Sequence, residues 1–247
     1  MKTCAFCDLG PPFTKEHIWP RGLISRFNEE LLTFNKHING HYKGDPLIKD
    51  VCQNCNNVKL IALDSYLCQL YDNHIGKIIN SGEDVAIKYD YDLLLRGLLK
   101  ISYNSARTQK HAISTATHKR YSKYILNGEY CPKTLLRLQI VTSSKVLDPE
   151  DGSSKLIEPG FLRCADIKYE GLLNHRFMIR MVAINSFWFF IIMSHRNESA
   201  NKWKQFLANF NTSMRLKGVL VNPKAEILNI RVSQTTYIHP NLLGSLV

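Results

Sequence analysis

The sequence predicts an α+β protein, with a small metal-binding unit first, a basic helical segment next and a mostly antiparallel β-sheet last. Two Cys-x-x-Cys pairs lie near the N-terminus. Apolar residues at helical spacing dominate about 90–128, and short runs rich in Val, Ile and Phe follow one another over about 135–235, as strands do. We therefore expect two domains, residues 1–82 and residues 83–247.

The cysteine pairs Cys4-x-x-Cys7 and Cys52-x-x-Cys55 predict a structural zinc site. Two such pairs supply the four sulfur ligands of tetrahedral zinc. A disulfide framework is not expected, because the chain has an odd number of cysteines and "MKTCAFCDLGPPF" lacks the apolar core of an export signal. A redox role would require a thioredoxin-like βαβ setting, which surrounds neither pair.

Helices are expected on either side of "NSGED", residues 80–84, which is the candidate domain boundary. The spacing of apolar residues in "CNNVKLIALDSYLCQLYDNHIGKII" predicts a helix that follows the second cysteine pair and closes the first domain. The segments "YDLLLRGLLKISYNSA" and "TATHKRYSKYILNG" also read as helices. The second of these ends at Gly128, with Pro132 shortly beyond as a stop signal.

The C-terminal part reads as strands such as "RFMIRMVAI" and "SFWFFIIMS", with an Asn-Ser turn between these two and a short helix at "NKWKQFLANF". Strands this apolar imply a sheet covered on both faces, or a protein partner or second copy of the chain that covers one. Residues 177–193 are interrupted by Arg180, Asn185 and Ser186 and fall short of the ~20 apolar residues of a membrane span. We expect a cytoplasmic protein.

The net charge of +11 is concentrated in one stretch. Residues 96–145 hold ten Lys and Arg residues against a single Glu, which gives +9, whereas residues 1–82 hold nine against eight. Such a concentration favours a polyanionic partner, above all nucleic acid, through release of counterions. The candidate phosphate-contacting residues of this stretch are Arg96, Lys100, Arg107, Lys110, Lys119, Arg120 and Lys123. The interleaved Tyr103, Tyr121 and Tyr124 either stack on bases or pack inward.

The order C-x-x-C, then "EHIWPRG", then "CQNCNNVK" resembles the HNH endonucleases of the ββα-metal, or treble-clef, class, in particular the four-cysteine subgroup. The similarity covers about residues 1–65. It implies a ββα-metal unit, phosphodiester hydrolysis in DNA more than in RNA, products with 5′-phosphate and 3′-hydroxyl ends, and a catalytic Mg²⁺ or Mn²⁺ beside the structural zinc.

The resemblance also implies roles for four residues. Glu16 matches the acidic ligand of the catalytic metal, His17 the general base and Asn56 the second ligand, while Lys59 matches a phosphate contact one turn later. Hydrolysis of a phosphodiester needs a base for water and charge neutralisation at the phosphate, and histidine changes protonation near neutral pH. Asn56 could also cap the helix, or exchange roles with Asn57.

The middle residue of the HNH pattern is not evident, since neither Asn nor His occurs in "DPLIKDV" before the second cysteine pair. In the family this position orients the histidine base. His37, Asn39 and His41 are candidates, and a backbone carbonyl could also serve.

Three hypotheses follow from these observations. The first is an HNH endonuclease, for which phage defence or restriction is a natural setting by analogy. The second is a non-catalytic zinc module that binds nucleic acid. The third is a nuclease effector whose C-terminal domain binds a protein partner or a signal that switches it.

Overall fold

The structure, a computed structural model, describes residues 2–27, 32–35, 40–44, 47–147, 152–214 and 217–232. It combines helices and antiparallel strands, so the predicted α+β class is confirmed at this level. Within the described residues the chain forms two compact units. The first comprises Met1–Tyr71, Asp92–Thr134 and His195–Asn197, and the second comprises Asp72–Tyr91, Leu135–Ser194 and Glu198–Val247.

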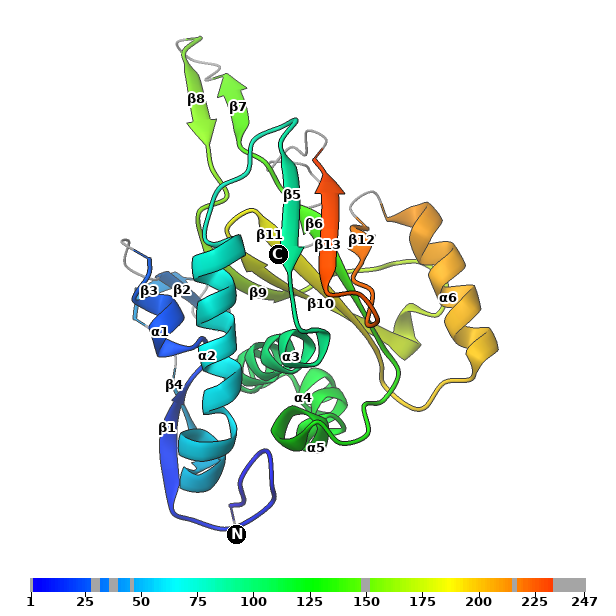
Figure 1. Cartoon of the computed structure of the whole chain (residues 1–247). Helices are drawn as coiled ribbons and strands as arrows, with labels where there is room; N and C mark the ends of the chain where they lie inside the picture. The colour runs from blue at the N-terminus through cyan, green and yellow to red at the C-terminus, as the bar shows by residue number, and fades with distance from the viewer. Residues whose placement is uncertain are drawn as a thin grey trace. The chain divides into compact units, whose positions relative to one another are not determined.

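The first unit begins with an antiparallel pair of strands that is followed by a helix (Figure 1). Its elements are β1 (Phe13–His17), α1 (Arg21–Ile24), β2 (Leu32–Asn35), β3 (Gly40–Lys43), β4 (Leu47–Cys52), a π-helical turn (Cys55–Lys59), α2 (Ile61–Leu70), α3 (Tyr91–Thr108), α4 (Ala112–Lys119) and α5 (Ser122–Asn127). β1 pairs with β4, with Phe13 opposite Cys52 and His17 opposite Leu47. The predicted helix after the second cysteine pair is α2, and Leu63, Leu67 and Leu70 form its buried face.

The three helices α3, α4 and α5 belong to the same compact unit as the cysteines, which differs from the predicted division after residue 82. The sequence gives a physical reason at Gly97. A Cβ at this position would lie 3.0 Å from the Leu67 side chain, so the absence of a side chain lets α3 approach α2 closely.

The second predicted helix of the basic segment is divided in the structure, because α4 ends at Lys119 and α5 begins at Ser122. The end at Gly128 is confirmed. Gly128 has φ +69°, the left-handed conformation that favours glycine just after a helix. Arg96 of α3 donates to the carbonyls of Ile125 and Leu126, so it satisfies the last turn of α5.

The second unit is built on a five-stranded sheet with the strand order β12, β6, β11, β10, β9 (Figure 1). Its elements are β5 (Asp84–Lys88), β6 (Thr134–Ile140), β7 (Ser144–Leu147), β8 (Ser154–Ile157), β9 (Leu162–Asp166), a 3₁₀ turn (Asn174–Arg176), β10 (Phe177–Ile184), β11 (Phe187–Ser194), α6 (Ala200–Ser213), β12 (Val219–Leu220) and β13 (Ile227–Arg231). The pairs β10/β11, β10/β9 and β12/β6 are antiparallel, as predicted.

The β10–β11 hairpin forms the core of the second unit. Asn185 and Ser186 make its two-residue turn, as predicted, and Asn185 has φ +50°, a conformation that Asn tolerates. Every residue of both strands is buried. α6 packs Trp203, Phe206 and Phe210 against one face of the hairpin. α6 thus covers one face of this hairpin within the second unit, and a partner or second copy of the chain at this sheet stays a prediction.

No helix in the described part of the chain has both the length and the apolar character of a membrane span.

Candidate metal centre and the polar cluster beside it

The four cysteines of the two Cys-x-x-Cys pairs come together in the first unit, and their ligand atoms all lie within 4.8 Å of one another. Cys4 and Cys7 lie in the N-terminal loop, Cys52 ends β4, and Cys55 begins the π-helical turn. All four are free thiols, and the Sγ atoms of Cys7 and Cys52 are 3.6 Å apart. Tetrahedral zinc with Zn–S bonds of about 2.3 Å holds its sulfurs roughly 3.8 Å apart. The cluster is therefore placed to hold a metal ion, and its donors fit zinc.

Backbone N–H groups stabilise negative charge in this cluster. The Cys52 N–H donates to Cys4 Sγ at 3.3 Å. Burial raises the pKa of Cys4, but the N–H groups of Cys52, Cys7 and Phe6 together outweigh it and lower the pKa to about 7. Burial and the thiols of Cys7 and Cys52 raise the pKa of Cys55. A metal binds thiolates rather than thiols, so the lowered pKa of Cys4 favours the form that binds a metal.

Glu16 is buried on β1 and takes part in a polar cluster with α3. It is 4 % exposed, whereas its neighbour His17 is partly exposed. The Glu16 carboxylate lies 2.7 Å from Lys100 Nζ, and Asn104 Nδ2 donates to it at 3.3 Å. The carboxylate is held inside the protein, so the geometry gives no support to its expected role as a ligand of Mg²⁺ or Mn²⁺.

Lys100 is the cation of this cluster and not a surface residue. Its side chain is 1 % exposed, and Nζ donates to both carboxylate oxygens of Asp64, at 2.6 Å and 2.8 Å, as well as contacting Glu16. Burial lowers the pKa of Lys100, but the charges of Asp64 and Glu16 outweigh burial and raise it. The expected contact between Lys100 and a nucleic-acid phosphate is wrong for this structure, because the ammonium is enclosed between two carboxylates.

Asn104 connects α3 to the backbone of His17. Its Nδ2 donates to the His17 carbonyl at 3.0 Å, and its Oδ1 accepts from Arg107 Nη2 at 2.8 Å. Lys100, Asn104 and Arg107 recur at helical spacing, so they lie along one side of α3. The Arg107 side chain is only 6 % exposed. This side of α3 therefore fixes the strand that carries Glu16 and His17.

Asn56 reaches across to the same strand instead of capping a helix. Its Nδ2 donates to Thr14 Oγ1 at 2.9 Å and to the Lys15 carbonyl at 3.0 Å. The structure thus brings Asn56 to the residues just before Glu16 and His17. Lys59 Nζ donates to Asn127 Oδ1 at the end of α5.

The remaining predicted phosphate contacts divide into bound and exposed residues. Arg96 is bound to Asp92 and to the end of α5, Lys119 to Asp8 and to the Ala5 carbonyl, and Arg120 to Asn197. Lys110 and Lys123 are exposed. The three tyrosines interleaved with these cations pack inward, since Tyr103, Tyr121 and Tyr124 are all buried.

Asn104 is a site residue that sequence reasoning missed. A signal existed, because Lys100 and Asn104 lie one turn apart in the leucine-rich stretch "LLLRGLLKISYN". Of the candidates for the middle HNH position, His37 and Asn39 lie outside the described residues. His41 lies in β3, where only the backbone is described.

In the part of the chain that the structure describes, the four cysteines are the one group of three or more His, Cys, Asp or Glu side chains arranged to hold a metal ion. Comparison of the chain with models of protein families, with curated proteins and with solved structures found no match.

Proposed function

We propose that this protein is a nuclease of the HNH type that hydrolyses phosphodiester bonds, with a structural zinc at the four cysteines and His17 as general base. One observation carries the proposal. The Asn56 amide donates to the Lys15 carbonyl, which places it beside Glu16 and His17 on a strand pair followed by a helix. The resemblance calls for this grouping of residues in a ββα-metal unit.

His17 has the properties required of the base. It is partly exposed at the end of β1, and its carbonyl is fixed by Asn104. Histidine can take a proton from water near neutral pH and orient the resulting nucleophile towards a phosphate. Asn104 would limit movement of the His17 backbone, and exposed lysines such as Lys110 and Lys123 would attract the polyanion.

A catalytic Mg²⁺ or Mn²⁺ would neutralise charge on the phosphate and on the leaving oxygen. The Glu16 carboxylate does not fit that role here, because Lys100 already neutralises it in a buried position. We therefore assign no step to a second metal. In this proposal the four cysteines hold zinc, His17 acts as the general base, and Asn56 helps to position the strand that carries His17.

The burial of Glu16 also favours a second candidate, a zinc module that binds nucleic acid without cutting it. In such a protein the Glu16–Lys100 pair would be purely structural. Binding in every divalent metal without cleavage, and no loss of affinity on His17→Ala, would establish this alternative.

The test is incubation of the purified protein with plasmid DNA and with RNA in Mg²⁺, Mn²⁺, Zn²⁺ or EDTA. We expect DNA to be nicked or cut. His17→Ala should retain its circular dichroism spectrum and bound zinc but lose cutting. The matched control is His175→Ala, which removes an exposed histidine of the second unit and should cut normally. Equal cutting by His17→Ala would rule out the proposed base.

A further inference from the structure

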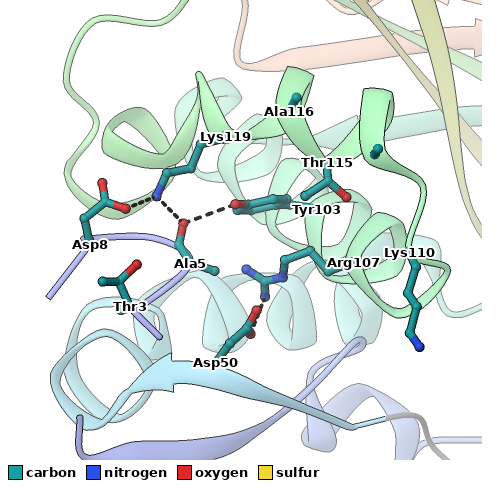
Figure 2. Close-up of a pocket in the computed structure, with 12 residues that line it drawn as sticks. Thr3, Ala5, Asp8, Asp50, Tyr103, Arg107, Lys110, Thr115, Ala116 and Lys119 are labelled. Atoms are coloured by element: carbon teal, nitrogen blue, oxygen red, sulfur yellow. Dashed lines mark hydrogen bonds and ion pairs between the residues drawn. The ribbon is translucent and has the colours of Figure 1, made fainter. Parts of the chain in front are cut away.

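A hollow lies on the first unit, between the N-terminal loop and the helices α3 and α4 (Figure 2). Three cations line it, Arg107, Lys110 and Lys119, against two carboxylates, Asp8 and Asp50. The lining is therefore positive by one charge. Figure 2 shows the Arg107 guanidinium centrally among the lining residues, with Lys119 and Asp8 to one side and Lys110 to the other.

Arg107 is held rigidly but is not satisfied. Its side chain is 6 % exposed, and its guanidinium carbon lies 4.3 Å from the ring centroid of Tyr103 and 5.0 Å from that of Phe6. Nη2 donates to Asn104, but Nε and Nη1 are buried and have no hydrogen-bond partner among the described residues. A buried charged donor without an acceptor is unfavourable, so the position suits a ligand that brings acceptor oxygens.

The neighbouring carboxylates do not fill this need. Asp50 Oδ1 forms an ion pair with Arg107 Nη2 at 3.7 Å, which is too long for a hydrogen bond, and this oxygen has no hydrogen-bond partner among the described residues. Asp8 is already bound by Lys119 at 2.6 Å. Lys110 lies just beyond the end of α3 and is exposed, and its ammonium makes no hydrogen bond or ion pair with the described residues. Among the described residues, the lining charge without a carboxylate partner is thus the ammonium of Lys110.

We propose that this hollow binds one phosphate group of a nucleic-acid backbone, with Arg107 and Lys110 as its ligands. That the phosphate belongs to a nucleic acid rests on the proposed function. Guanidinium N–H groups donate strong hydrogen bonds to phosphate oxygens, and an ammonium adds a point charge. Arg107 also holds Asn104, which holds the His17 carbonyl, so the bound phosphate lies next to the scaffold of the proposed base.

The test measures binding and not cutting, in EDTA, by fluorescence anisotropy with a labelled 12-nucleotide single strand and a 12-base-pair duplex. Inorganic phosphate is titrated in as a competitor. The variants are Arg107→Lys, which keeps the charge but loses the planar donors, and Lys110→Ala. The control is Lys204→Ala, an exposed lysine of α6 in the second unit. Thermal unfolding verifies that each variant folds.

We expect Arg107→Lys and Lys110→Ala to weaken oligonucleotide binding about five- to tenfold. Lys110→Ala should also lower the magnitude of the slope of log K against log salt by about 0.9 for the duplex and about 0.7 for the single strand, the values for one phosphate contact. Lys204→Ala should bind as the wild type does. Competition by millimolar phosphate that disappears in Lys110→Ala would also support the site, and would identify free phosphate as a second source.

Wild-type affinity in both Arg107→Lys and Lys110→Ala would overturn the proposal, as would an absence of saturable binding to oligonucleotide and to phosphate. If Arg107→Lys does not fold, Lys110→Ala and the phosphate competition decide the outcome. Binding that depends on Lys110 without any cutting in Mg²⁺ would refute the nuclease and keep the phosphate site. Cutting in Mg²⁺ together with binding that depends on neither Arg107 nor Lys110 would support the nuclease and refute the phosphate site.

Discussion

Replacing Lys100 with methionine tests whether the buried ammonium holds the first unit together. The ammonium lies 2.7 Å from Glu16 Oε1 and 2.6 Å from Asp64 Oδ1. Removal of one partner from a buried ion pair costs about 3–5 kcal/mol, because the other charge stays buried without compensation. The Glu16 side chain is 5 % exposed and that of Asp64 is 31 % exposed, so water can compensate Asp64 but not Glu16. We assign most of the cost to Glu16.

The assay is urea unfolding followed by circular dichroism, for the wild type, Lys100→Met, Glu16→Gln and the double variant. Lys100→Met should lower the free energy of unfolding by about 3–5 kcal/mol. The double variant lacks the Glu16 carboxylate that Lys100→Met leaves unpaired. The double-mutant cycle should therefore give a coupling energy of roughly 1–3 kcal/mol between Lys100 and Glu16. The control is Lys123→Met, an exposed lysine of α5, which should change stability by less than about 0.5 kcal/mol. A coupling near zero, or a loss below about 1 kcal/mol in Lys100→Met, would refute this reasoning.

Further predictions concern pH, the metal and the second core. Because the pKa of Lys100 is raised in the folded state, its contribution is fully present below the ordinary value of 10.5 and is lost as pH rises through the higher folded value. Between pH 10.5 and that higher folded value, stability should therefore fall more steeply with pH in the wild type than in Lys100→Met. Removal of the metal with a chelator should unfold the first unit, and so should Cys55→Ser, with a loss of helical circular dichroism in both cases. Added Zn²⁺ should restore the signal of the chelated wild type but not that of Cys55→Ser. Phe206→Ala, in the core of the second unit, should cost about 3–5 kcal/mol in urea unfolding, whereas replacing the exposed Lys204 with Ala should cost little.

Features encoded by neighbouring residues were predictable from the sequence. The β10–β11 hairpin follows from two apolar runs around Asn185 and Ser186, and the end of α5 follows from Gly128. The four-cysteine cluster was equally predictable, because ligand spacing within each pair is local and four sulfurs satisfy one tetrahedral metal.

Features decided by long-range packing were not predictable. A lysine in a basic helical segment reads as exposed, and only the burial of Glu16 against α3 shows that Lys100 is an internal cation. The compact units of the structure differ from the predicted division for the same reason. Gly97 carries no periodic signal of its own, yet it allows the close approach of α3 to α2 that joins residues beyond 90 to the cysteine unit.

The first unit is discontinuous along the chain, and this affects how the protein can be made. During synthesis the strand bearing Glu16 is complete long before residue 100 is added. Until then the carboxylate has no ammonium to accompany it into the interior, and the strand also lacks the Asn104 amide that fixes the His17 carbonyl. A fragment ending at residue 82 would remain at this unfinished stage, so recombinant study of the cysteine unit requires a chain that continues at least through α5 at Asn127.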